Sequence, residues 1–179
     1  TGYGVNSVFA VWFNRAFFTK GNGICSVIAS FQQQFRFVED KLVGFLDEIQ
    51  TKQLSFINNK IKSVILTTES LNDKNKSMSY ELYKSKTNTK ISFDNNEITV
   101  NVSVKTYVNI GETETKADYS DPKEVEKARV NLQRNMEKDL NNLIEVAQKD
   151  FKCDIFGIGN KINKKNPDKW SEYKENWEE

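Results

Sequence analysis

Residues 97–110 read EITVNVSVKTYVNI, and this stretch decides the fold. β-Branched, mostly apolar side chains occupy every second position: Ile98, Val100, Val102, Val104, Thr106 and Val108. Polar residues such as Asn101 and Ser103 lie between them. Alternation with period two is typical of a β-strand that buries one face and exposes the other. We therefore predict an α+β fold, in which a mainly antiparallel sheet carries helices on one side.

Neighbouring segments carry the same strand signal. Two alternating runs lie within 78–93, and Asp94-Asn95-Asn96 is a turn sequence that joins them to the central strand. The β-branched run IKSVILTT at 61–68 is a further strand candidate. Three shorter strands are predicted nearer the N-terminus, the last two as a hairpin: 25–31, 35–38 and 42–46.

A long helix is predicted at 122–151. Asp121, Pro122 and Glu124 form a capping-box start, because an acidic cap, a proline at the first helical position and a glutamate three residues on all favour a helix N-terminus. Apolar residues then recur at steps of three and four, and we expect this face to cover the sheet: Leu132, Met136, Leu140 and Leu143 are its centre.

Shorter helices are expected before the predicted strand at 61–68 and after the long helix. Asp47 with Gln50 predicts a capped helix over 48–57. Asn166-Pro167 predicts the start of a C-terminal helix on which three aromatic residues share a face: Trp170, Tyr173 and Trp177. We interpret that face as core, with docking of a partner as the alternative.

Residues 5–18, VNSVFAVWFNRAFF, place many aromatic residues on a broad face of a predicted helix. Exposed alone, such a face would be a large apolar patch. We therefore expect it to pack against a preceding domain or a second copy of the chain. The candidate interface residues are Val8, Trp12, Phe13 and Phe17.

Composition excludes several function classes. The 179 residues hold 26 Lys and Arg against 25 Asp and Glu, so no strong net charge favours nucleic-acid binding. Histidine is absent, which removes Ser-His-Asp and Cys-His catalysis and every histidine zinc site. Cys25 and Cys153 have no metal-site spacing and are expected to be small buried residues, with a disulfide as the alternative. No metal site or cofactor is predicted.

The remaining short motifs do not indicate chemistry. Gly157-Ile158-Gly159 lacks the third glycine and the preceding strand of a nucleotide loop, so close backbone packing is the better interpretation. Asp47-Glu48 and Glu178-Glu179 are adjacent in sequence, which gives no sign of carboxylates facing each other across a cleft. We therefore predict no catalytic residues and no enzyme, with a hydrolase-like or small-ligand-binding domain of an unrelated family as the alternative.

Two separated motifs resemble a known family. Residues 37–48, FVEDKLVGFLDE, are followed by KIKS at 60–63; the closing pattern is DIFGIG at 154–159, then KKNPDKW at 164–170 and Asn176-Trp177. In this order they are similar to the C-terminal domain of spore germinant receptor C-subunit lipoproteins, the Ger(x)C family. The motif residues, which we expect to be structural, are Gly44, Leu46, Asp47, Glu48, Gly157, Gly159, Pro167, Trp170 and Trp177.

The resemblance covers residues 35–179, whereas 1–34 match much less well and are interpreted as the end of a preceding domain. It implies a non-catalytic lipoprotein subunit of a nutrient receptor that triggers spore germination. In that family the lipid anchors the protein to the outer face of the spore inner membrane, beside integral membrane A and B subunits. This sequence contains no lipid-attachment cysteine, so the anchor is expected only in the full-length protein.

Overall fold

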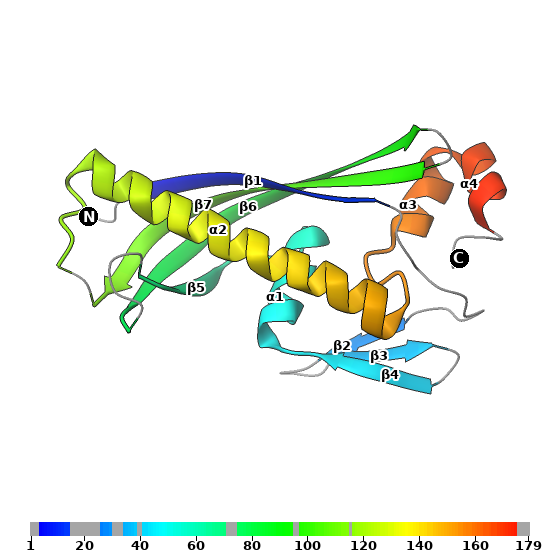
Figure 1. Cartoon of the computed structure of the whole chain (residues 1–179), viewed down its shortest axis with the longest axis horizontal. Helices are drawn as coiled ribbons and strands as arrows, with labels where there is room; N and C mark the ends of the chain where they lie inside the picture. The colour runs from blue at the N-terminus through cyan, green and yellow to red at the C-terminus, as the bar shows by residue number, and fades with distance from the viewer. Residues whose placement is uncertain are drawn as a thin grey trace. The chain divides into compact units, whose positions relative to one another are not determined.

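The computed structural model describes residues 4–14, 26–29, 34–38, 41–70, 75–94, 97–114 and 116–174, and the side chains of 6–43 lie outside that description. Figure 1 traces the chain. It divides into two compact units, and the long elements contribute to both. The first unit comprises Thr1–Val11, Ser55–Thr89 and Val102–Lys138; the second comprises Trp12–Leu54, Lys90–Asn101 and Asp139–Glu179.

The larger sheet has the strand order β1-β7-β6-β5 (Figure 1). Its strands are β1 (Gly4–Asn14), β5 (Val64–Glu69), β6 (Ser77–Asp94) and β7 (Glu97–Thr113). β5 and β6 pair antiparallel, with Val64 opposite Leu82 and Glu69 opposite Ser77. The predicted strands at 78–93 and 97–110 are confirmed. β5 starts three residues later than predicted, and the Ile61 carbonyl ahead of it accepts a hydrogen bond from the Ser85 hydroxyl at 3.1 Å.

The helix predicted for residues 5–18 is wrong over residues 5–14, and residues 15–18 lie outside the described residues. Gly4–Asn14 is the edge strand β1, next to β7, and Val5 at its start is buried. A dense apolar run matches the helical and the strand period equally well. The valine, phenylalanine and tryptophan content favours a strand once a partner strand is available, and β7 supplies that partner.

The long helix covers the sheet as predicted. α2 (Pro122–Val146) continues as a π-helical turn, η1 (Ala147–Phe151), which ends at Lys152 in the left-handed region. The apolar face is fully buried, with Leu132, Met136, Leu140 and Leu143 no more than 2% exposed. On the sheet side, every residue of the alternating series 98–108 is also buried. In the first unit the Tyr80 hydroxyl ties the two layers together by donating to the Ala128 carbonyl at 2.9 Å.

The second unit contains a smaller sheet and the short helices. β2 (Ser26–Ala29), β3 (Gln34–Val38) and β4 (Lys41–Leu46) form an antiparallel sheet in sequence order, with an irregularity between Arg36 and Phe37. α1 (Glu48–Ile57), α3 (Ile158–Lys165) and α4 (Pro167–Tyr173) complete the helices. The predicted hairpin and the helices at 48–57 and after Asn166 are therefore confirmed.

Candidate functional site

The first family motif builds the junction between β4 and α1. The Asp47 carboxylate accepts the Gln50 backbone N–H at 2.7 Å, and the Gln50 side chain accepts the Asp47 backbone N–H at 3.0 Å, so the predicted capping box is formed. Leu46 is completely buried. Glu48 is exposed and pairs with Lys52 at 2.7 Å, which lowers the pKa of its carboxyl. The junction is thus held by a reciprocal pair of hydrogen bonds and one ion pair.

Gly44 of the first motif packs against Phe151, at the end of the long helix, in the second unit. A β-carbon at Gly44 would lie 2.3 Å from Cε1 of Phe151, far inside van der Waals contact. Only glycine lets the Phe151 ring lie directly on the β4 backbone. The glycine of the first motif is therefore a packing residue for the end of the long helix.

The second motif is organised by the Asp154 carboxylate. It accepts the backbone N–H groups of Phe156 at 3.2 Å and Gly159 at 2.8 Å, so a side chain of the chain itself caps the start of α3. Gly157 has φ of +64°, a conformation that favours glycine, and no atom would contact a β-carbon there. The close packing predicted at Gly157 is therefore wrong, whereas Gly159 is buried.

The C-terminal aromatic face is partly described. The Asn166 side chain accepts the Lys169 backbone N–H at 3.2 Å, and Pro167 begins α4 as predicted. Tyr173 is buried and stacks on Phe93, with ring centroids 5.8 Å apart. Trp170 is half-buried, and Trp177 lies outside the described residues. The core interpretation is confirmed for Tyr173 and stays a prediction for Trp177.

The predicted interface residues lie on or next to the edge strand. Val8, Trp12 and Phe13 belong to β1, but their side chains are outside the description, as is Phe17 altogether. Their role as an interface stays a prediction. Cys153 is buried as expected, and Cys25 is outside the described residues.

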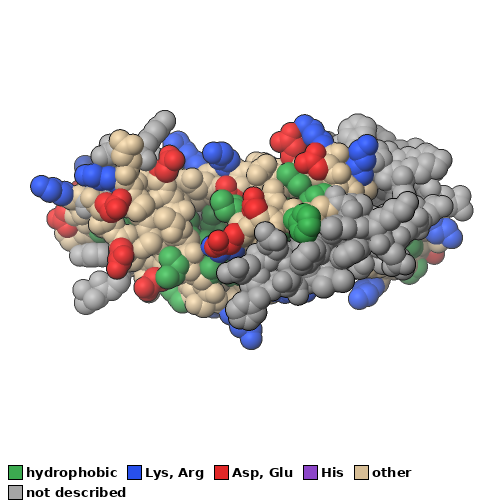
Figure 2. Space-filling view, turned by 90° about the horizontal axis from the view of Figure 1, so that it is seen from below, with side chains coloured by type: hydrophobic (Ala, Val, Ile, Leu, Met, Phe, Trp, Pro, Cys, Tyr) green, Lys and Arg blue, Asp and Glu red, His purple; other side chains and the backbone are tan. Residues whose placement is uncertain are grey.

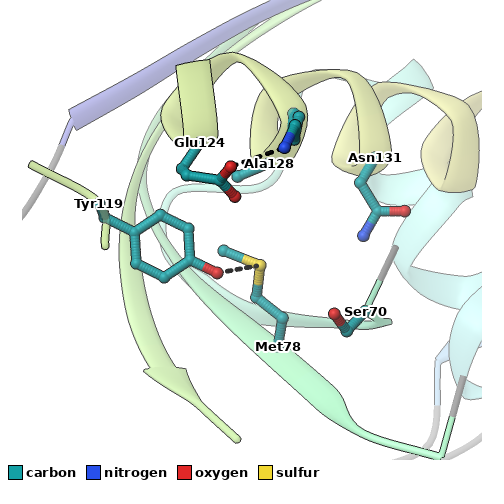
Figure 3. Close-up of a pocket in the computed structure, with 7 residues that line it drawn as sticks. Ser70, Met78, Tyr119, Glu124, Ala128 and Asn131 are labelled. Carbon is teal, nitrogen blue, oxygen red and sulfur yellow. Dashed lines mark hydrogen bonds and ion pairs between the residues drawn. The ribbon is translucent and has the colours of Figure 1, made fainter. Parts of the chain in front are cut away.

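Figure 3 shows a small polar hollow beside the start of α2. Glu124 forms an ion pair there with Lys127 at 2.6 Å, and the Tyr119 hydroxyl donates to the sulfur of Met78 at 3.6 Å. The free volume is about 20 Å³, enough for one water molecule. Its lining consists of Ser70, Met78, Tyr119, Glu124, Lys127, Ala128 and Asn131. The hollow has no room for a substrate.

The capping box predicted for Asp121 and Glu124 is only half formed. Asp121 caps α2 through its carboxylate, which accepts the Lys123 backbone N–H at 2.9 Å. The backbone N–H of Asp121 donates to the Asp118 carbonyl at 3.1 Å instead of to the Glu124 side chain. The carboxylate of Glu124 is thus available for Lys127.

A cluster of lysines and tyrosines on the outer face of the sheet was missed by sequence reasoning. The exposure pattern of β6 changes phase at Tyr83-Lys84, where two successive residues are exposed after the buried Leu82. Both meet one residue of β7: the rings of Tyr83 and Tyr107 are 6.3 Å apart, and the Lys84 ammonium lies 5.3 Å from the Tyr107 ring.

Lys105 completes this cluster, with its ammonium 5.0 Å from the Tyr107 ring. The pKa of Tyr107 lies below its ordinary value, chiefly through hydrogen bonding by Lys105 and also through the charges of Lys105, Lys84 and Lys86. The available signal was the spacing of Lys84-Lys86 and Lys105-Tyr107 along paired strands. Read one strand at a time, each of these residues is only an ordinary exposed position.

Within the described part of the chain, no group of three or more Cys, Asp or Glu side chains has the arrangement of a metal site. Among the same residues, no helix is both long and apolar enough to cross a membrane. On the face shown in Figure 2, acidic and basic side chains are interspersed and hydrophobic ones form small groups.

Comparison with protein families matches residues 35–179 to the family described as "Spore germination B3/ GerAC like, C-terminal". The chain belongs to this family. Both motif regions of the GerAC-like C-terminal domain lie inside the matched range. The predicted resemblance is thereby confirmed, and an unrelated family is excluded as the source of this fold.

Two known proteins place the GerAC-like domain in context. "Spore germination protein B3" of Bacillus subtilis (strain 168) is 28% identical over 141 residues, which cover 78% of this chain and 37% of that protein. The "Crystal Structure of the GerBC protein" has the same fold, with a TM-score of 0.63 and 21% identity, over 99% of this chain and 52% of that one. The chain thus spans about a third of the first of these longer proteins and about half of the second.

Proposed function

We propose that this chain is a non-catalytic part of a germinant receptor subunit that helps nutrients to trigger bacterial spore germination. The observation that carries the proposal is the family match over residues 35–179. The name of the Bacillus subtilis relative, a spore germination protein, supports the same process. The full-length protein would act as a lipoprotein on the outer face of the spore inner membrane, in a complex with integral membrane A and B subunits.

The described carboxyl groups support a role without catalysis. A carboxyl that acts as a general acid in a hydrolase typically has a pKa raised by burial. The carboxyl pKa shifts found in the described residues go the other way. Glu48 and Glu126 are lowered by Lys52 and Arg129, and Asp118 is lowered by hydrogen bonds from Ser120. These groups are stabilised as exposed anions.

Deleting the gene in the spore-former that carries it tests the proposal. Deletion spores should lose germination with at least one nutrient in a panel of amino acids and sugars, and a reintroduced wild-type copy should restore it. Germination with a non-nutrient trigger should be unchanged, which controls for general spore damage. Normal germination with every nutrient in the panel would refute the proposed function.

Nutrient recognition is proposed to belong to another subunit. The hollow beside the start of α2 holds about one water molecule, whereas an amino-acid site needs converging charged partners in a larger cavity. Isothermal calorimetry of the purified chain with each nutrient of the panel should give no binding heat. Saturable heat with the nutrient that requires the gene would overturn this assignment.

The edge strand β1 is proposed to contact a preceding domain or a second chain, with self-association through residues 5–18 as one form of that contact. An edge strand presents unpaired backbone groups that pair readily with another strand. In a variant that keeps Trp12 as its sole tryptophan, acrylamide should quench the fluorescence strongly. A fully shielded Trp12 in the monomeric chain would contradict this contact.

A further inference from the structure

The outer face of β5, β6 and β7 in the first unit carries two large apolar side chains in the open. Ile65 is 61% exposed and Tyr83 is 55% exposed. They line one shallow depression together with Glu81 and Asn109. A solvated sheet face is normally polar, so this apolar centre calls for a covering surface.

One end of this face is basic. Lys84, Lys86 and Lys105 gather around Tyr107, next to the apolar centre at Tyr83. Among the described residues, none of these three lysines forms an ion pair, whereas helix lysines such as Lys52 and Lys127 each hold a carboxylate. The positive charge at this end is therefore available to a partner.

The other end is acidic. A second depression begins at Ile65 and Glu81, which it shares with the first, and extends to Glu112 and Glu114. The Ser79 hydroxyl fixes the backbone of Glu112 here through two hydrogen bonds, at 2.7 and 3.1 Å. The sequence of charges along the face is therefore acidic, apolar, basic.

We propose that this face binds the same face of a second copy of the chain, related by a two-fold axis through the Ile65–Tyr83 centre. A two-fold axis that lies in the plane of the face, perpendicular to the line from its acidic to its basic end, brings the acidic end of each copy onto the basic end of the other and the apolar centre onto itself. Both charge sets are thereby paired at once. A partner whose charges all have one sign, such as an acidic peptide, would pair with only one of the two charged ends.

The size of the face sets the expected strength. Ten residues along each of β6 and β7 and the six residues of β5, with strands about 4.8 Å apart and about 3.3 Å of rise per residue, give about 410 Å² per copy, below the roughly 800 Å² of a standard interface. We expect a weak dimer, with a dissociation constant on the order of 10⁻⁵ to 10⁻⁴ M. Because charge pairing contributes, raising the salt concentration should weaken it further.

Sedimentation equilibrium of the 179-residue chain at about 200 μM, above the expected dissociation constant, tests the proposal. Two variants reverse one end each: Lys84→Glu/Lys86→Glu makes both ends acidic, and Glu81→Lys/Glu112→Lys makes both ends basic. Each alone should associate at least about tenfold more weakly than the wild type, since the two-fold axis repeats the reversed end in both copies and like charges then face each other at both ends of the interface. A one-to-one mixture of the two variants should restore the dimer.

The mixture makes the test specific, because each variant supplies the charges that the other has lost. Circular dichroism spectra equal to that of the wild type establish that both variants fold. A wild-type chain that stays monomeric would overturn the proposal and leave the face to a different partner. A dimer of unchanged strength in both variants would also overturn it, and would move the contact to another surface such as residues 5–18.

Discussion

Replacing Gly44 by alanine should destabilise the second unit through one collision. The new β-carbon would lie 2.3 Å from Cε1 and 3.0 Å from Cδ1 of Phe151. Carbon atoms in contact lie about 3.5–4.0 Å apart, so the ring or the strand must shift by more than about 1 Å. Phe151 is buried at the last position of the π-helical turn, and such overpacking costs about 1–3 kcal/mol.

Thermal and urea unfolding followed by circular dichroism measure this cost. For a chain of this size, about 1–3 kcal/mol lowers the melting temperature by about 2–12 °C. Gly4→Ala is the matched control, because no atom lies within 4 Å of a β-carbon at Gly4, and it should change stability by less than about 0.5 kcal/mol.

A double-mutant cycle with Phe151→Leu identifies the cause. If the collision with the ring is responsible, Gly44→Ala should cost much less in the Phe151→Leu background, with a coupling of about 1 kcal/mol or more. Equal costs in both backgrounds would refute the collision, and so would a Gly44→Ala chain as stable as the wild type.

Three further predictions concern the first unit and the second motif. Asn131→Leu removes hydrogen bonds to the Thr68 hydroxyl at 3.0 Å and the Glu69 carbonyl at 2.8 Å and should cost about 1–3 kcal/mol in urea unfolding, whereas the exposed Asn142→Leu should cost little. Gly157→Ala forces an alanine to φ of +64° and should cost about 1–2 kcal/mol; an unchanged urea midpoint would contradict this. Burial raises the pKa of Tyr80 from 10.0 to about 12. The stability that its protonated hydroxyl contributes to the fold is therefore fully present below pH 10 and is lost as the pH rises through 12. The urea midpoint of the wild type should therefore fall more between pH 9 and about pH 11 than that of Tyr80→Phe, and parallel curves would refute the assignment.

Elements whose signals are local were predictable from the sequence. The strict alternation of residues 97–110 fixes the buried face of β7, and the caps at Asp47, Asp121 and Asn166 fix three helix starts. Each depends on neighbours within a few residues, so one sequence contains the whole signal.

Features that depend on distant partners were not predictable in this way. Residues 5–18 satisfy two periodicities, and only the presence of β7 beside them decides for a strand. The lysine and tyrosine cluster requires the pairing of β6 with β7 and a phase change at Tyr83. The need for glycine at position 44 is not visible in the sequence, because the ring that packs on it belongs to Phe151, more than a hundred positions away.

The central claim is that this chain works by contacts within a membrane receptor, and co-purification from spores tests it most directly. An affinity-tagged full-length protein would be crosslinked in dormant spores, extracted from the inner-membrane fraction with detergent, and identified with its partners by mass spectrometry. We predict that it is recovered from the inner membrane together with two integral membrane subunits encoded for the same receptor. Recovery outside the membrane fraction, without either subunit, would contradict the account.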